Sequence, residues 1–158
     1  MSSASGAHRA AVADDPLATA LIATVPPIMR HLLAHARRRP AWTDMTYQQY
    51  NVLRIIGDGE SSQAEIARRL IVTAPVVTRL ANVLAEAALV ERREDPDDRR
   101  ALILTLTDEG RARVRDMRRD LLEAARELLE PLPAEQRTAV ADALDQLQLL
   151  VPERSAPR

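Results

Sequence analysis

The feature that most constrains the fold of this chain is a change of hydrophobic period, from helical to alternating and back, between residues 89 and 107. Before this stretch, apolar residues recur three and four positions apart, which is typical of amphipathic helices. Leu102, Leu104 and Leu106 then alternate with Ile103 and Thr105, which is the period of a strand. Helical spacing returns after residue 107. The pattern predicts a mainly helical chain that contains one short β-hairpin.

Capping residues and prolines bound the predicted elements. Helices are expected over about 15–38, 46–58, 62–70, 73–87, 107–129 and 134–151, and strands over 90–94 and 101–106. Pro26 and Pro27 are expected to kink or interrupt the first helix, because a proline removes an internal hydrogen bond. The middle of the chain is therefore predicted to be a helix-turn-helix followed by a two-stranded wing. In such a unit one helix enters the major groove of DNA and the hairpin reaches the minor groove.

Composition removes several classes of function. The chain has no cysteine, which excludes disulfides, thiolate metal sites and cysteine-based catalysis. It has no Ser/His/Asp grouping at a turn, no glycine-rich phosphate loop and no cluster of metal ligands, so we expect neither an enzyme nor a catalytic residue, metal or cofactor. The uncharged stretch 17–29 is too short and too broken by prolines to span a bilayer, and the N-terminus lacks the apolar core of a signal peptide. A cytoplasmic protein without a membrane partner is expected.

Four segments resemble the motifs of a known family. They cover the second helix, the third helix, the recognition helix and the wing, at 45–53, 63–70, 76–84, and 94–100 with 104–110. Together they resemble the MarR family of winged helix-turn-helix transcriptional regulators over about residues 45–115. The wing signature is the specific part of the resemblance, because a helix-turn-helix alone is a weak signal.

The resemblance implies a fold, an organisation and a function. The fold would be mainly α with a small two-stranded β wing, that is, a winged helix-turn-helix plus helical dimerisation arms. The chain would comprise a disordered tail (1–14), a dimerisation region (15–40 and 111–151), a DNA-binding domain (41–110) and a C-terminal tail (152–158). The protein would be a ligand-responsive repressor that binds double-stranded DNA at an inverted-repeat operator as a homodimer. The alternative is a winged-helix protein-interaction module that does not bind DNA.

Two positions depart from the family pattern. Ala88 stands where the family has a glycine, just before the Leu-Val that opens the first wing strand. If the backbone is left-handed there, alanine costs roughly 1 kcal/mol or more. The second departure is Pro26-Pro27 in the first arm, which affects the expected dimer geometry and not the DNA-binding motif.

The recognition helix is expected to bury one side and to present the other to DNA. At 100° per residue, the buried side would hold Val76, Leu80, Val83, Leu84 and Ala87, and the exposed side Ala74, Thr78, Ala81, Asn82 and Ala85. The exposed side is small and nearly uncharged, which suits close approach to base edges better than a solvated surface. The residues expected to contact DNA are Arg68, Arg69, Ala74, Pro75, Val77, Thr78, Arg79, Asn82, Arg92, Arg99 and Arg100. Of these, Arg99 or Arg100 would enter the minor groove, where the negative potential is strongest.

A small aromatic or phenolic effector is expected to bind near the three aromatic residues of the chain. Trp42, Tyr47 and Tyr50 lie close together in the sequence, and the resemblance implies that this region borders an effector pocket. His31 and His35 of the first helix would lie nearby. The alternatives are that the aromatic residues are core anchors and that the histidines face solvent. Metal ligation by the two histidines is not expected, although their spacing would place them on one helix face.

Overall fold

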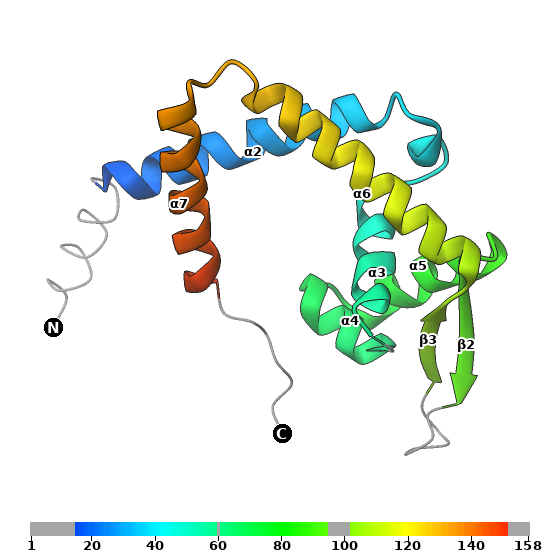
Figure 1. Cartoon of the computed structure of the whole chain (residues 1–158). Helices are drawn as coiled ribbons and strands as arrows, with labels where there is room; N and C mark the ends of the chain where they lie inside the picture. Colours follow the sequence, from blue (N-terminus) through cyan, green and yellow to red (C-terminus); the bar gives the residue numbers. More distant parts are fainter. Residues whose placement is uncertain (1–14, 60, 95–101, 152–158) are drawn as a thin grey trace, which may run out of the picture.

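The computed structural model describes residues 15–59, 61–94 and 102–151, which form a helical arm region joined to a winged helix (Figure 1). The arm region contains α2 (Pro16–Ala36), the upper part of α6 (Asp108–Leu129) and α7 (Ala134–Leu150). A 3-10 helix, η1 (Pro40–Trp42), leads into the winged helix. The winged helix contains α3 (Tyr47–Gly57), β1 (Ser61–Ser62), α4 (Gln63–Leu70), α5 (Ala74–Glu86), β2 (Val90–Glu94) and β3 (Leu102–Leu106). The predicted tails 1–14 and 152–158 lie outside the described residues.

Side-chain caps start the helices largely where the sequence predicted them. Thr46 and Gln49 form a complete capping box at α3: the Thr46 hydroxyl accepts from the Gln49 N–H at 3.2 Å, and the Gln49 Oε1 accepts from the Thr46 N–H at 2.7 Å. Ser62 caps α4 by accepting from the Glu65 N–H at 3.2 Å. Thr73 is the residue before α5, but among the described residues its side chain accepts no capping hydrogen bond. Pro75 in the first turn removes one of the N–H groups that a cap would satisfy.

The wing belongs to a three-stranded antiparallel sheet in the order β1-β3-β2. The predicted hairpin is confirmed, with Val90 opposite Leu106 at its base and Glu94 opposite Leu102 toward its tip. The third strand, β1, was not predicted, because its two serines are too short a segment to show any hydrophobic alternation. By pairing with β3, β1 fixes the start of α4 against the wing.

One hydrophobic core holds the winged helix together, and α6 extends it toward the arms. α3 contributes more of it than any other element, and α5, β3 and α6 close over α3. Fully or almost fully buried members include Val52, Leu53, Ile55, Ile66, Val77, Leu84, Leu104 and Met117. Burial of a large aliphatic side chain contributes about 1.5–3 kcal/mol to folding, so this cluster provides a rigid base for the surfaces built on it.

The buried side of α5 is rotated relative to the predicted one. The predicted core residues that do pack against the core are Val76, Leu80 and Leu84. Val83 is 42% exposed and Ala87 is exposed, so their predicted burial is wrong. Ala81, which was expected on the exposed side, is fully buried. Both α4 and β2 pack on α5, and Ala81 is small enough to be buried at such contacts. A prediction from helix periodicity alone does not take this packing into account.

The first arm helix is continuous through Pro26 and Pro27, so of the two predicted outcomes the interruption is wrong and the kink stays a prediction. The two prolines remove the hydrogen bonds to the carbonyls one turn earlier, but their fixed φ is compatible with a helix. By length and composition alone, α2 is therefore long and apolar enough to cross a membrane; it lies near the N-terminus, and its most apolar window has none of its residues buried. The prolines thus do not exclude a span in the way the sequence argument assumed.

Among the described residues other than glycine, Ile71 at φ 56° and Ala88 at φ 57° adopt the left-handed conformation. Ile71 directly follows α4, and Ala88 lies two residues after the end of α5. In both cases the N–H of the left-handed residue and that of the next residue donate to carbonyls in the last turn of the helix. Glycine is favoured at this position because it has no Cβ. The backbone at Ala88 is therefore left-handed, and the strain that a glycine would avoid is present there.

Candidate nucleic-acid interface

α4, the turn at residues 71–73 and α5 form the helix-turn-helix. Ile71 ends α4 in the left-handed conformation, with its N–H directed to the Arg68 carbonyl and the Val72 N–H to the Ala67 carbonyl. This sharp turn packs α4 against α5 and leaves one face of α5 without a covering element in the described chain. Such a geometry matches the helix pairs that place their second helix in the major groove.

Five of the predicted contacts lie on the uncovered face of α5. The exposed ones are Ala74, Pro75, Thr78, Arg79 and Asn82. Val77 was predicted to contact DNA and is fully buried, so that prediction is wrong. It belongs to the same buried arc as Ala81, and the rotation of that arc explains both errors. The five exposed residues are small or polar, with a positive charge at Arg79.

The first residue of α4 bonds to the recognition helix. The Thr78 hydroxyl donates to Gln63 Oε1 at 2.8 Å and also lies 3.1 Å from the Ala74 carbonyl oxygen one turn earlier. Gln63 was not among the predicted site residues. Its position in the family-like segment 63–70 was visible in the sequence, but its pairing with a residue fifteen positions later was not.

The first wing strand also bonds to the recognition helix. The Arg92 guanidinium of β2 donates to Asn82 Oδ1 of α5. Both side chains are exposed. This contact brings Arg92, one of the residues predicted to contact DNA, to the exposed residues of α5, so that the helix and the wing are joined there.

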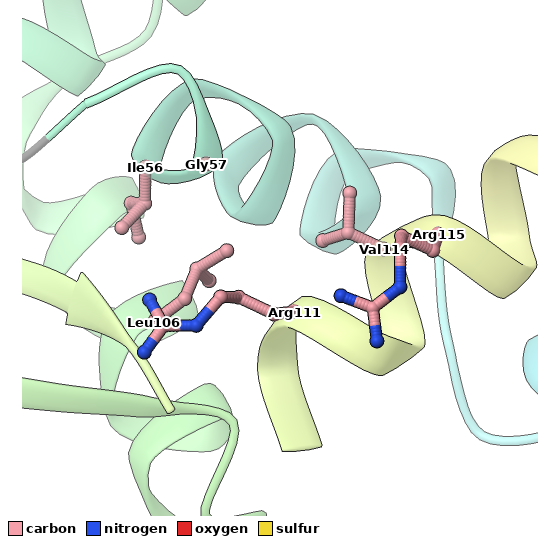
Figure 2. A pocket seen from close by; sticks show the side chains of 6 residues that line it. All are labelled: Ile56, Gly57, Leu106, Arg111, Val114 and Arg115. Atoms are coloured by element: carbon pink, nitrogen blue, oxygen red, sulfur yellow. The ribbon is translucent and has the colours of Figure 1, made fainter. Parts of the chain in front are cut away.

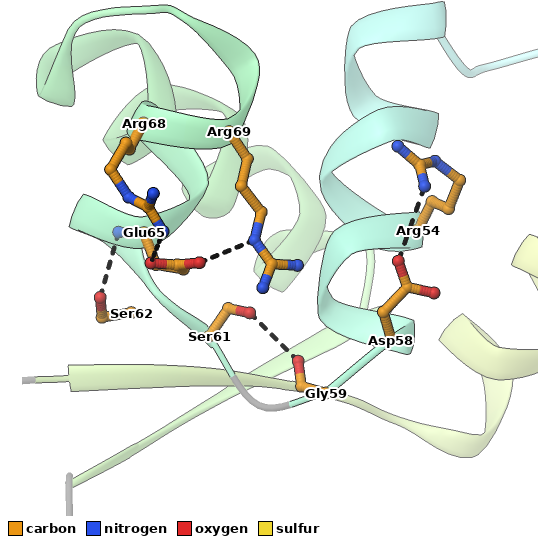
Figure 3. Close-up of polar contacts among 8 residues, drawn as sticks. All are labelled: Arg54, Asp58, Gly59, Ser61, Ser62, Glu65, Arg68 and Arg69. Atoms are coloured by element: carbon orange, nitrogen blue, oxygen red, sulfur yellow. Dashed lines mark hydrogen bonds and ion pairs between the residues drawn. The ribbon is translucent and has the colours of Figure 1, made fainter. Parts of the chain in front are cut away.

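Arg68 and Arg69 extend from α4 and share one carboxylate (Figure 3). Glu65 lies 2.7 Å from Arg68 Nη2 and 2.7 Å from Arg69 Nε. The hydrogen bond from Arg68, followed by that from Arg69, holds the pKa of Glu65 below its ordinary value. The side chains of Arg68 and Arg69 are 32% and 38% exposed. This exposure leaves room for a phosphate oxygen at their guanidinium groups, beside the carboxylate that they share.

The wing tip carries the remaining predicted contacts. Arg99 and Arg100 lie outside the described residues, so their entry into the minor groove stays a prediction. The strands that lead to them are described, and Arg93 pairs with Glu91 at 3.4 Å on β2. β2 and β3 are paired up to Glu94 and Leu102, the last described residues on either side of residues 95–101.

The aromatic residues predicted to line an effector pocket form a packed row. Ring centroids lie 5.4 Å apart for Trp42 and Tyr50 and 6.1 Å apart for Tyr47 and Tyr50. Trp42 and Tyr50 are buried, and Tyr47 is half-buried. The Trp42 indole N–H has no hydrogen-bond partner among the described residues. Burial in this row also raises the pKa of the Tyr50 hydroxyl.

The histidines of α2 lie on the face that packs against α6. His35 Nε2 is 3.1 Å from Glu127 Oε2, and Arg39, just after α2, pairs with Glu123 at 3.2 Å. The His31 and His35 rings are 6.5 Å apart. Across the described residues, no group of three or more histidine, aspartate or glutamate side chains converges as metal ligands would. These contacts tie the first arm to the helix that leads into the wing.

A pocket of about 200 Å³ lies at the other end of α3, where α6 leaves the wing (Figure 2). Its lining combines three apolar side chains, Ile56, Leu106 and Val114, with two cationic ones, Arg111 and Arg115. Arg111 pairs with Asp108 at 3.3 Å. The pocket was not predicted, because its lining joins the end of α3 to residues 106–115, which are about fifty positions later in the sequence.

Comparisons with known proteins agree with this geometry. The sequence profile of the MarR family matches residues 43–101. YdgJ of Bacillus subtilis, an uncharacterised HTH-type transcriptional regulator, is 29% identical over 89 residues, which cover 56% of this chain and 54% of YdgJ. The chain spans about half the length of the curated relatives it matches.

Solved structures show the same fold. Wild-type MarR from E. coli in its apo form superposes with a TM-score of 0.71 at 24% identity, covering 87% of this chain and 98% of MarR. BpsR of Bordetella bronchiseptica, whose DNA binding is regulated by 6-hydroxynicotinic acid, superposes with a TM-score of 0.61 at 22% identity, covering 78% and 89%. At these identities the likeness establishes the winged-helix fold with helical arms.

Proposed function

Because the chain is a member of the MarR family of winged helix-turn-helix regulators, we propose that it is a cytoplasmic repressor that binds an inverted-repeat operator as a homodimer. The observation that carries this proposal is the uncovered face of α5, where small and polar side chains lie beside Arg79 and the wing arginine Arg92. Small side chains permit close approach to base edges, and guanidinium groups bind bases and phosphates.

The arms supply the reason for a homodimer. In the single chain, α2 and α7 leave large aliphatic side chains uncovered, among them Leu17 at 77%, Ile22 at 74%, Leu149 at 80% and Leu150 at 77% exposure. Contiguous apolar surface of this kind marks an interface. A second copy related by two-fold symmetry would cover both helices and place two α5 helices on successive major grooves. The apolar character of α2 is then that of an interface helix.

DNA binding and assembly are tested together with the full-length protein. We expect a dimer mass in light scattering without detergent, and retardation of the DNA upstream of its own gene in a gel shift that weakens steeply with salt.

Arg79→Ala should weaken binding by about 1–3 kcal/mol. The matched control is Arg126→Ala, an equal change of charge at an exposed position of α6. A monomer that requires detergent, or equal affinity of both variants, would contradict the proposal. Absence of any DNA complex at low salt would favour the protein-interaction module.

A small aromatic or phenolic acid is proposed as the effector. The support is the row of aromatic rings beside the arm helices, the unbonded indole N–H of Trp42 and the regulation of BpsR by 6-hydroxynicotinic acid. Trp42 and Tyr50 are buried, so the ligand would enter beside the half-buried Tyr47. It would release DNA only if it bound the DNA-free arrangement of the dimer more tightly than the bound one.

The effector is tested with a panel of aromatic acids that includes 6-hydroxynicotinic acid. Trp42 is the sole tryptophan, so its fluorescence reports binding while a gel shift reports release of DNA. Tyr47→Phe should weaken both responses without a change in packing. Arg115→Gln serves as the comparison, because the pocket beside Arg115 is the competing site for a small anion. A panel that changes neither fluorescence nor DNA affinity would contradict a ligand response.

A further inference from the structure

The pocket between the end of α3 and the start of α6 combines aliphatic side chains with two cations (Figure 2). α3 supplies Ile56 and Gly57, and β3 supplies its last residue, Leu106. Arg111 and Arg115 are four positions apart on α6, which places both on one face of that helix. Among the described residues, no carboxylate lines the pocket. Its lining is therefore apolar and positively charged.

Both guanidinium groups are available to a ligand. Arg115 forms no hydrogen bond or ion pair with any residue that the structure describes, because its neighbour Asp116 pairs with Arg119 at 3.0 Å. Arg111 lies 3.3 Å from Asp108, whose side chain is fully exposed. An exposed ion pair corresponds to at most about 5-fold in an equilibrium constant. A carboxylate on a ligand can therefore replace Asp108 as the partner of Arg111 at little cost.

The size and the lining of the pocket define the class of ligand. A volume of about 200 Å³ holds roughly seven water molecules, so a ligand of about as many non-hydrogen atoms fits. The aliphatic lining favours a hydrocarbon chain, and the guanidinium groups favour a carboxylate, which accepts their N–H groups in pairs. We propose that this pocket is a regulatory binding site for a small apolar monocarboxylate such as pentanoate, separate from the aromatic row.

The pocket adjoins the junction that fixes the end of α5 to the start of α6. The Thr107 hydroxyl donates to the Ala88 carbonyl at 2.7 Å and accepts from the Gly110 N–H at 2.9 Å. A Cβ on Gly110 would lie 2.0 Å from the Leu89 carbonyl oxygen, so α6 begins in close contact with the residues after α5. A ligand in the pocket would lie against β3 and α6 on either side of Thr107. Its binding should therefore alter the placement of α5 and weaken DNA binding, which rests on the function proposed above.

Binding is measured first without DNA, by NMR titration of the full-length protein with sodium pentanoate. The backbone amides of Gly57 and Val114 should shift, whereas the fluorescence of Trp42, at the other end of α3, should not change. Pentanamide has the same shape without the charge, and inorganic phosphate has charge without the hydrocarbon, so both should bind at least about 5-fold more weakly. Equal affinity for pentanoate and either comparison compound would overturn the proposal, as would the absence of shifts at Gly57 and Val114.

Two matched pairs of variants locate the site. Arg115→Gln should weaken pentanoate binding about 5- to 12-fold, between the value of an exposed ion pair and that of a hydrogen bond to a charged group. Arg126→Gln, the same change elsewhere on α6, should not. Gly57→Ala should also weaken binding, because its Cβ would lie 3.3 Å from Leu106 Cδ1 and narrow the pocket, whereas Gly59→Ala meets nothing within 4 Å and should have no effect. Equal pentanoate affinity of Arg115→Gln and Arg126→Gln would overturn the assigned site.

A gel shift with the same proteins tests the regulatory role. Pentanoate should weaken DNA binding of the wild type about 5-fold or more, and the same concentration should have little effect on Arg115→Gln. Pentanoate that binds without weakening DNA binding would overturn the regulatory role. If Arg115→Gln lost DNA affinity and the wild type did not bind pentanoate, Arg115 would be a phosphate contact and the proposal would be overturned. A wild type that binds no DNA even without pentanoate would instead contradict the function proposed above.

Discussion

Replacing Ala88 by glycine should make the protein more stable, although it removes a methyl group and introduces a flexible residue. Ala88 follows α5 at φ 57° and is exposed. Its N–H donates to the Ala85 carbonyl at 2.9 Å, and the Leu89 N–H donates to the Leu84 carbonyl at 2.9 Å. These are the two bonds that close a helix through a left-handed residue. Glycine preserves both, because they involve only the backbone.

The expected gain is the difference between two effects. A left-handed residue with a Cβ costs roughly 1–2 kcal/mol, which glycine avoids. Glycine gives the unfolded chain more freedom, which costs about 0.4–1 kcal/mol. The methyl group of Ala88 is exposed, so its removal loses little buried area. The net gain in the free energy of unfolding is therefore about 0.5–1 kcal/mol, or about 1–4 °C in Tm for a chain of this size.

Chemical unfolding followed by far-UV circular dichroism measures this gain, at one fixed protein concentration because association adds to stability. The matched control is Ala87→Gly, which changes the neighbouring exposed alanine at φ −79°. There the Cβ is not strained, so glycine should lower stability by up to about 1 kcal/mol. If both variants lost stability equally, strain at Ala88 would not be the cause and the reasoning would be refuted.

Three further changes test other parts of the fold. Gly110→Ala should destabilise the protein by about 3 kcal/mol or prevent folding, because its Cβ would lie 2.0 Å from the Leu89 carbonyl oxygen; Gly59→Ala, which meets nothing within 4 Å, is the control in the same unfolding assay. Ile71→Gly should stabilise by about 1 kcal/mol, since its side chain is 74% exposed and its φ is 56°. Burial raises the pKa of Asp120 in the folded protein above its ordinary value of 3.8. The wild type therefore loses stability as the pH rises from 3.8 through this raised pKa. Asp120→Asn should be more stable than the wild type at pH 7, and unfolding curves measured across pH should show that this advantage vanishes below pH 3.8.

Much of the candidate interface followed from the sequence, and the errors share one cause. The exposed residues Thr78, Arg79 and Asn82 were predicted correctly, whereas Val77 and Ala81 were placed on the wrong side of α5. An amphipathic pattern defines a buried arc only to within about one residue, because successive positions differ by 100°. The packing of α4 and β2 on α5 decided which residues lie at the centre of its buried side.

The sequence by itself determined the features that depend on neighbouring residues. The helix starts at residues 46 and 62 and the β-hairpin that follows α5 depend on local sterics and short-range hydrogen bonds, which a few adjacent residues settle. Helix boundaries were predictable for the same reason.

Only the tertiary structure decided which distant side chains meet. It brought Gln63 to Thr78 and Arg92 to Asn82, buried Trp42 beneath the arms, and opened a pocket beside Arg115. It also kept α2 intact through its two prolines. Each of these outcomes depends on how whole elements pack, and the packing energy is spread over many weak contacts that no single segment of the sequence encodes.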